Sequence, residues 1–382
     1  MRFSLDRVPA ITQAPDALAG LGAIAARLGD GAPVLLVADP GLAAFGITGR
    51  AEASLRAAGL SVSTYTNIKS DPAAHQIDMA AALARMDDAG VVVALGGGSA
   101  MDAGKAAAAI APGQHGCEHY ALGANPLPAR PLRKICVPTT SGTGSETTRT
   151  SIVTDAAGAK VWLWGDTIKP DAVLLDPTLT VDLPAHMTAA TGIDALAHAL
   201  EAATNRNATE STDLFCHEAI RLVVRYLPVA VAEPANLEAR AGLQWAAALA
   251  GIGIDNCGTA IAHNIGHALG SLRPIHHGRA VGVAMLATLA WNSSHDHYGR
   301  YAAVARSMGE DNPAQLVPAY ERLLRRVGVK VRLRDEGHND ITPEQLAVQM
   351  TRPENASMRA SNARDTTDED LLAFARTVLT QA

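Results

Sequence analysis

One carboxylate and three imidazoles stand out in this sequence for the chemistry that their types and spacing allow. Asp194 and His198 lie four residues apart in TGIDALAHALEA, and His263 and His277 follow in IAHNIGHALG and RPIHHGRAVG. Residues four apart on a helix project from one face, one turn apart. One aspartate and three histidines are a plausible ligand set for a divalent first-row metal, without any thiolate. This pattern predicts a metal site.

The sequence offers one more candidate ligand than the four residues named above. His267 lies four residues after His263 and so repeats the spacing of Asp194 and His198. Five candidates compete for four places, and one of them is expected to serve another role. The alternative is a helix-bundle core whose histidines are hydrogen-bonded and bind no metal.

A glycine-rich turn follows an apolar run in VVVALGGGSAMDAGK, residues 91–105. Glycines let the backbone approach a pyrophosphate, and a helix that begins there offers free N–H groups and the positive end of its dipole. The turn lacks the spacing of the GxGxxG fingerprint, so an ordinary tight strand–helix turn is the alternative. A second loop, VPTTSGTGSE at 137–146, also follows a strand-like run and supplies Thr139, Thr140 and Thr143. Two such loops at successive strand ends indicate one shared ligand, a dinucleotide.

Asp39 ends the first strong strand-like run, PVLLVAD. A carboxylate at that place can bind ribose hydroxyls and repel the 2′-phosphate of NADP. A cap on the turn that begins at Pro40 is the competing interpretation.

The elements that must position these residues differ between the two halves of the chain. Residues 1–182 alternate short β-rich runs with helical text, which predicts an α/β domain with a doubly wound parallel sheet. Residues 183–382 contain long helical segments without convincing strands, which predicts an all-helical domain. The four candidate ligands lie in the second half and the glycine turn in the first.

Composition excludes several classes of protein. The 382 residues carry a net charge of −6, which argues against nucleic acid as a partner. The four cysteines are far apart and form no CxxC pair, so we expect buried thiols in a reducing compartment. The first residues lack a secretory h-region, and no apolar run approaches the roughly 20 residues of a membrane span. A cytoplasmic protein without a membrane partner is expected.

The motifs GGGSAMDAGK, PTTSGTGSE, TGIDALAHALEA, AHNIGHALG and HHG occur in this order, and together they resemble the group III, iron-containing alcohol dehydrogenase family. The resemblance covers essentially the whole chain. It implies a dehydroquinate synthase-like fold, with an N-terminal Rossmann-like domain and an all-α C-terminal domain. It also implies an oxidoreductase, in which hydride passes between NAD and a metal-bound alcohol or aldehyde, and a homodimer.

The resemblance assigns roles to individual residues. Asp194, His198, His263 and His277 match the metal ligands, and His267 matches a histidine with a proton-relay role. Fe(II) is the metal we favour, with Zn, Mn or Ni as alternatives. The positions that match cofactor-binding residues are Asp39, Gly96, Gly97, Gly98, Ser99, Asp102, Thr139, Thr140, Thr143 and Lys160, the last expected in a turn.

Other relatives with this fold remain alternatives, namely maleylacetate reductase, glycerol dehydrogenase and a hydroxyacid–oxoacid transhydrogenase. A metal- or nucleotide-binding protein without turnover is a further alternative. Three arginines, Arg149, Arg273 and Arg359, lie on segments that in this family approach the metal. Because arginine pairs well with carboxylates, we hypothesise a short anionic aldehyde as substrate. The competing interpretation is that these arginines pair with acidic side chains or hold cofactor phosphates.

Overall fold

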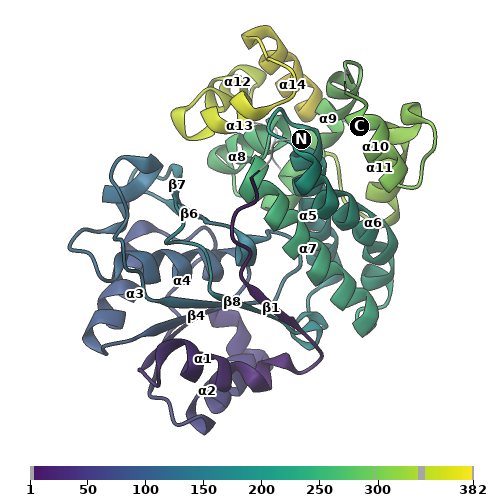
Figure 1. The fold of residues 1–382 in the computed structure, drawn as a ribbon. Coiled ribbons are helices and arrows are strands. Elements are labelled where there is room, and N and C mark those ends of the chain that lie inside the picture. The colour runs from purple at the N-terminus through teal and green to yellow at the C-terminus, as the bar shows by residue number, and fades with distance from the viewer. Residues whose placement is uncertain (1–3, 297, 334–339, 381–382) are drawn as a thin grey trace. The chain divides into compact units, whose positions relative to one another are not determined.

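The computed structural model describes residues 4–296, 298–333 and 340–380 (Figure 1). The chain divides into two compact units. The α/β unit contains Arg7–Asp182, and the helical unit contains Leu183–Ala382 together with Met1–Asp6.

The α/β unit is built on a six-stranded parallel sheet with the order β1-β8-β5-β4-β2-β3. Its strands are β1 (Ala10–Gln13), β2 (Val34–Ala38), β3 (Val62–Tyr65), β4 (Val91–Gly96), β5 (Arg133–Pro138) and β8 (Ala172–Leu175). Its longer helices are α1 (Leu21–Gly29), α2 (Ile47–Ala57), α3 (Ala74–Met86) and α4 (Gly98–Ile110). Strands β2 and β4 are buried along their whole length, as expected for apolar runs in the middle of a parallel sheet.

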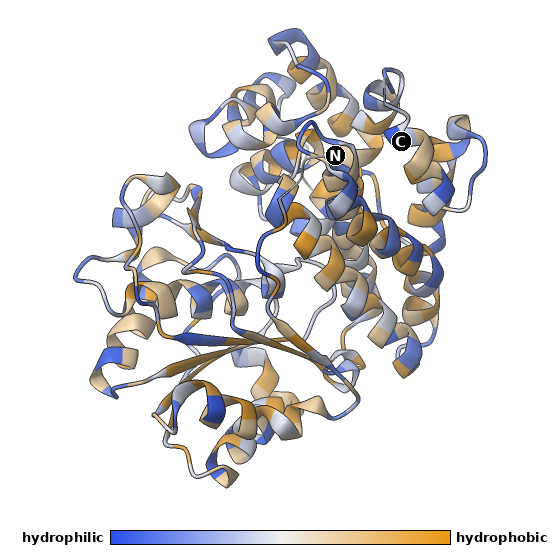
Figure 2. Ribbon diagram, viewed as in Figure 1, coloured by the Kyte–Doolittle hydropathy of each residue, from blue (hydrophilic) through white to orange (hydrophobic). Residues whose placement is uncertain are grey.

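Alternate residues of β2 enter two different cores, because successive side chains of a strand point to opposite faces. Leu35 and Val37 pack with α3 and α4 on one face, whereas Leu36 and Ala38 pack with α1 and α2 on the other. Figure 2 shows hydrophobic residues along the sheet and on the helix faces turned toward it. Helices therefore cover both faces, which is the doubly wound arrangement predicted from the alternation of strands and helices.

Two elements of this unit escaped the sequence prediction. Strand β1 is only four residues long and largely exposed, so its pattern carries little signal. The antiparallel hairpin of β6 (Thr150–Thr154) and β7 (Lys160–Trp164) was also missed. Lys160 was expected in a turn, but it begins β7 and pairs with Thr154. The turn is therefore shorter than expected and ends before Lys160.

The helical unit is organised around α5 (Ala185–Thr204), whose residues from Thr188 onward are all buried. A helix that is buried all round lies in the middle of a core, and α6, α7 and α9 pack around this one. Its other helices are α6 (Glu210–Ala232), α7 (Leu237–Cys257), α8 (Ile261–Leu272), α9 (His277–Ser293), α10 (Arg300–Ser307), α11 (Leu316–Arg326), α12 (Pro343–Met350), α13 (Ala356–Ser361) and α14 (Asp368–Thr380). Among its described residues there is no strand, so the predicted fold class is confirmed.

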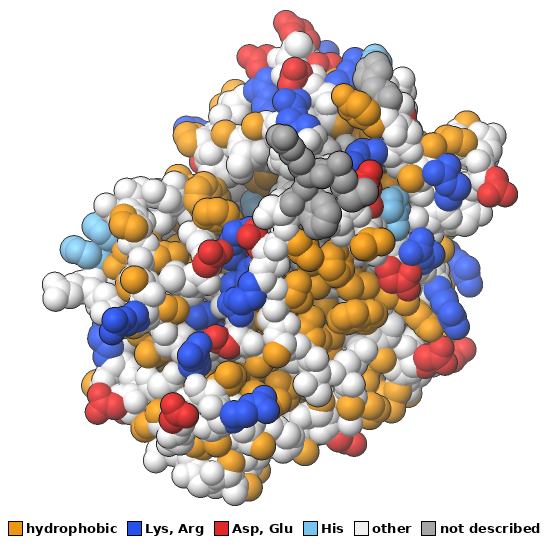
Figure 3. Space-filling view, viewed as in Figure 1, with side chains coloured by type: hydrophobic (Ala, Val, Ile, Leu, Met, Phe, Trp, Pro, Cys, Tyr) orange, Lys and Arg blue, Asp and Glu red, His pale blue; other side chains and the backbone are white. Residues whose placement is uncertain are grey.

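The cysteines and the surface agree with the composition. All four cysteines are buried and free of disulfide bonds. On the face drawn in Figure 3, Lys and Arg side chains are interspersed with Asp and Glu. Within the described part of the chain, no helix is both long enough and apolar enough to span a membrane.

Candidate functional site

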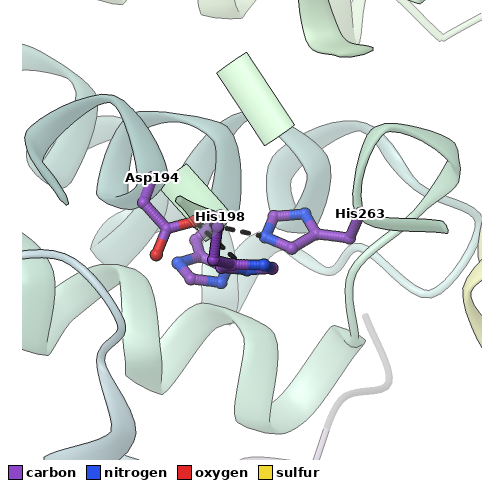
Figure 4. Close-up of side chains that lie close together, drawn as sticks. Asp194, His198 and His263 are labelled. Carbon is purple, nitrogen blue, oxygen red and sulfur yellow. Dashed lines mark ion pairs between the residues drawn. The ribbon is translucent and has the colours of Figure 1, made fainter. Parts of the chain in front are cut away.

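The structure brings together the four side chains that the sequence singles out as metal ligands. Asp194 and His198 project from the middle of α5, His263 lies in the first turn of α8, and His277 is the first residue of α9. One possible ligand atom from each residue lies within 4.8 Å of the corresponding atoms of the other three. Figure 4 shows the Asp194, His198 and His263 side chains pointing toward one another.

Glycine at position 278 allows this approach. A Cβ atom there would lie 2.2 Å from the Ala190 carbonyl oxygen and 2.9 Å from the Asp194 Cβ. Only glycine lets the start of α9 lie directly against α5, and His277 precedes it. The HHG motif therefore contributes both an imidazole and the close helix contact that positions it.

The distances fit a metal ion. Asp194 Oδ1 lies 3.7 Å from His263 Nε2 and 3.6 Å from His277 Nε2. Ligand atoms at about 2.1 Å from a tetrahedral metal are separated by about 3.4 Å. Asp194 Oδ1 and His263 Nε2 are also buried without a hydrogen-bond partner, a costly state for polar atoms. Two unsatisfied ligand atoms that face each other at this distance are what a metal-binding site leaves when the ion is removed.

The electrostatics of the cluster are coupled. Burial by itself would raise the pKa of Asp194, but the imidazoles of His198, His277 and His263 hold that pKa well below its usual range. Burial opposes protonation of His263, yet the carboxylates of Glu201 and Asp194 raise the pKa of this histidine to about 9. Because an imidazole binds a metal only in its neutral form, protonation of His263 would compete with metal binding.

Glu201 is a residue of this site that the sequence analysis missed. It lies on α5, is 4% exposed, and its Oε2 is 2.6 Å from His263 Nδ1. The signal was available, because Asp194, His198 and Glu201 follow one another at i, i+4 and i+7. That spacing puts the three ionisable side chains on one face of the helix.

His267 lies beside the cluster and outside it. It follows His263 by one turn of α8 and is partly exposed. Its ring contacts that of His277 edge to face, with 5.2 Å between the ring centroids. Of the five candidates, His267 is the one that the structure leaves out of the four-residue group.

The two predicted cofactor loops lie side by side in the α/β unit. Strands β4 and β5 are paired in register up to Gly96 and Pro138, and the Thr139 N–H donates to the Gly96 carbonyl. Helix α4 begins at Gly98, so the N–H groups of its first turn are directed toward this edge of the sheet. A Cβ atom at Gly98 would lie 2.7 Å from the Thr143 side chain. The glycine turn and the threonine loop therefore form one continuous surface. Their close contact at Gly98 leaves no room for a side chain at that position.

The carboxylates of Asp39 and Asp102 both have hydrogen-bond partners within the α/β unit. Asp39 Oδ1 accepts from the Gly41 N–H at 2.8 Å, which is the capping role weighed as its alternative. Asp102 accepts from the Ser145 hydroxyl at 2.5 Å and from the Ile152 N–H at 3.0 Å. Both oxygens of Asp102 thus hold the threonine loop and the β6–β7 hairpin against α4.

Lys160 and Ser99 converge on one loop. Lys160 Nζ lies 2.9 Å from Asp71 Oδ1, and the Asp71 N–H donates to the Ser99 hydroxyl at 3.1 Å. Asp71 therefore links the start of β7 to the first turn of α4.

The three arginines of the substrate hypothesis have acidic partners within the chain. Arg149 pairs with Asp166 at 3.1 Å and Arg359 with Asp368 at 3.3 Å, while Arg273 forms an ion pair with Asp340. This is the competing interpretation of the sequence analysis. An anionic substrate therefore stays a prediction, and the geometry of these three arginines does not support it.

We expect Gly96→Ala to destabilise the α/β unit and to weaken dinucleotide binding. Gly96 has φ +147°, and a Cβ atom there would lie 2.7 Å from the Ala100 Cβ and 2.9 Å from the Asp39 Cβ. Strain of this kind costs about 1–3 kcal/mol, to be measured by urea denaturation. Gly49→Ala in α2 is the control, because nothing lies within 4 Å of its added methyl group. Equal stabilities of the two variants would contradict the prediction.

Comparison with known proteins supplies the family. The family model for iron-containing alcohol dehydrogenase matches residues 9–177, and that for the C-terminal part of the Fe-containing alcohol dehydrogenase family matches residues 188–379. The NAD-dependent methanol dehydrogenase of Bacillus methanolicus is 34% identical over 72% of this chain and 72% of its own length. The 1,3-propanediol dehydrogenase of Klebsiella pneumoniae is 32% identical over 95% of each chain. A crystal structure of sulfoacetaldehyde reductase from Bifidobacterium kashiwanohense in complex with NAD+ superposes with a TM-score of 0.90, at 28% identity and 100% coverage of both chains.

Proposed function

Because the chain belongs to the iron-containing alcohol dehydrogenase family, we propose that it is an NAD-dependent, metal-dependent alcohol dehydrogenase and aldehyde reductase. As a member of this family it is an oxidoreductase that acts on CH–OH groups. The observation that carries the proposal is the largely buried group of one carboxylate and three imidazoles, in which two ligand atoms have no hydrogen-bond partner.

Asp194, His198, His263 and His277 would hold the metal. A carboxylate and three imidazoles suit Fe(II), which the family favours, and also Zn, Mn and Ni. When bound, such an ion supplies Lewis acidity that lowers the pKa of an alcohol. Asp194 and His263 are buried, so bulk water is excluded from these two ligands and their electrostatic interactions with a bound ion would be strengthened.

The glycine turn and the threonine loop would hold the dinucleotide. N–H groups at the start of α4 would bind the pyrophosphate, and Ser99 and Thr139, Thr140 and Thr143 would bind its neighbouring groups. The NAD complex of the sulfoacetaldehyde reductase supports the choice of cofactor. Lys160 is expected near the nicotinamide ribose. Asp102 would act on the cofactor side by holding Ser145 and Ile152 in place.

His267 would carry the proton that the alcohol releases. Its partial exposure and the contact of its ring with His277 support a role in moving a proton from the ligand cluster to water. An imidazole is suited to this task near neutral pH because its ordinary pKa lies there.

We expect the enzyme to prefer NAD to NADP, and Asp39→Gly to narrow or reverse that preference. A carboxylate at the end of β2 repels a 2′-phosphate, and glycine removes that repulsion. The ratio of kcat/KM for the two cofactors measures the effect. Asp39 also caps the turn that starts at Pro40, and glycine would remove this cap together with the charge. Asp39→Asn keeps the cap and removes only the charge, so it should show the same change in cofactor preference. Equal kinetics with both cofactors in the unaltered enzyme would contradict this assignment.

An NADH-linked screen of aldehydes, with Fe, Zn, Mn and Ni each supplied, tests the function. Pairs of neutral and carboxylated aldehydes of equal length would test the prediction of an anionic substrate, which the similarity to sulfoacetaldehyde reductases supports. Turnover with added NADH is expected. A nicotinamide that stays bound through purification and turnover would indicate a transhydrogenase instead. Absence of turnover with every aldehyde and metal would contradict the proposal.

We also propose a cytoplasmic homodimer. Four buried thiols without disulfides are typical of a reducing compartment. Figure 3 shows hydrophobic side chains gathered on the visible face, over the region labelled α7 in Figure 1, and such patches favour association. Light scattering of the purified protein tests the dimer.

A further inference from the structure

Glu201 is a buried carboxylate that collects three donors from the beginning of one helix. Its Oε2 accepts from the Ala260 N–H at 2.6 Å and lies 2.6 Å from His263 Nδ1. Its Oε1 accepts from the Ala262 N–H, also at 2.6 Å. All three donors belong to residues 260–263, where α8 begins, whereas Glu201 lies near the end of α5. The carboxylate thus joins the helix that carries Asp194 and His198 to the helix that carries His263.

This contact decides which nitrogen of His263 can bind a metal. An ionised carboxylate only accepts hydrogen bonds, so His263 Nδ1 must carry a proton. In the neutral ring the free electron pair then belongs to Nε2, which faces Asp194 Oδ1 at 3.7 Å. We propose that Glu201 is a positioning residue of the metal centre, which fixes the tautomer and the ring orientation of His263. This inference rests on the proposed metal site.

An amide could not replace the carboxylate in this position. If the NH2 group of a glutamine faced His263 Nδ1, it would donate to that nitrogen, force the proton onto Nε2 and remove the ligand. The same NH2 group would also face the Ala260 N–H, and two donors cannot form a hydrogen bond with each other. If the amide were turned over, its NH2 group would meet the Ala262 N–H instead. Either orientation breaks a buried hydrogen bond, and the first also gives the wrong tautomer.

The same contacts give Glu201 a structural role, which the experiment must separate from positioning. Ala260 and Ala262 contribute two of the N–H groups at the start of α8 that have no partner within the helix. Loss of these bonds lowers the thermal stability of the protein whether or not a metal binds. Metal affinity, together with its dependence on His263, is the property that a purely structural role leaves unchanged.

The test is a Co(II) titration of the full-length, metal-free protein against a competing chelator, followed by visible absorption. Glu201→Gln is expected to weaken Co(II) binding by about 10–100-fold, the usual effect of losing a carboxylate that orients a histidine ligand. The visible spectrum should also change, because one nitrogen ligand is weakened. Glu218→Gln, which changes a partly exposed glutamate on α6, is the matched control and should bind Co(II) like the parent.

A double-mutant cycle with His263→Ala completes the design. Three ligands remain in the His263→Ala background, and their weak Co(II) binding is titrated at higher Co(II) concentration, although the ion is not retained through purification. If Glu201 acts through His263, Glu201→Gln should change this residual Co(II) affinity by less than about twofold. Independent, additive losses would overturn the inference, as would parent-like Co(II) affinity in Glu201→Gln accompanied only by lower thermal stability. A parent protein that binds no Co(II) would overturn the proposed metal site, and this inference with it.

Discussion

Replacement of His263 by alanine is expected to abolish metal retention and turnover while dinucleotide binding persists. His263 Nε2 is buried without a hydrogen-bond partner and faces Asp194 Oδ1 at 3.7 Å, so its removal takes away one of the four ligands. Lewis-acid catalysis contributes several kcal/mol to stabilisation of the transition state. At about 1.4 kcal/mol for each factor of ten, kcat/KM should fall by about 10³-fold or more.

Three measurements make this prediction specific. Metal content should fall from one ion per chain to background, and binding of NADH should stay close to that of the parent, because the glycine turn belongs to the α/β unit. Loss of the His263 contact also leaves Glu201 with fewer donors, so thermal unfolding must confirm that the variant is folded at the assay temperature. His186→Ala, which removes an exposed histidine of α5, should keep both metal and activity. Full metal content in His263→Ala would refute the ligand assignment.

Replacement of His267 by alanine is expected to keep the metal and to lower kcat by about 10²–10⁴-fold, the range typical of acid–base groups. His267 lies one helical turn from His263, yet it is outside the four-residue group and partly exposed. Its loss removes a proton carrier and leaves the ligands in place.

The readouts for His267 distinguish a proton carrier from a structural neighbour. Metal content should equal that of the parent, and added imidazole should restore part of the lost rate by carrying the proton in its place. The rate of the variant should also depend on buffer concentration, which the parent rate should not. Loss of metal in His267→Ala with retention in His263→Ala would mean that the two roles are reversed, and an unchanged kcat would remove His267 from the mechanism.

Much of this site could be predicted from the sequence because its signals are local. A spacing of four residues puts Asp194 and His198 on one helix face, and the buried run of β4 leads directly into the glycine turn. Strands β2, β4 and β5 were predicted because strands buried in a parallel sheet are continuously apolar. The short, exposed β1 and the β6–β7 hairpin have no such pattern and were missed.

Pairings between distant residues were decided by the tertiary structure alone. The arginines that were weighed as an anion site pair with Asp166, Asp340 and Asp368. Glu201 and His263 are separated by 62 positions in the chain, and only the packing of α5 against α8 brings them within 2.6 Å. The sequence by itself determined the fold class, the family motifs and the residue types of the site, because periodicity and spacing act within one helix or one strand. The family motifs had also left His267 outside the ligand set. Which carboxylate orients His263 depends on how α5 and α8 pack against each other, and no local pattern encodes that.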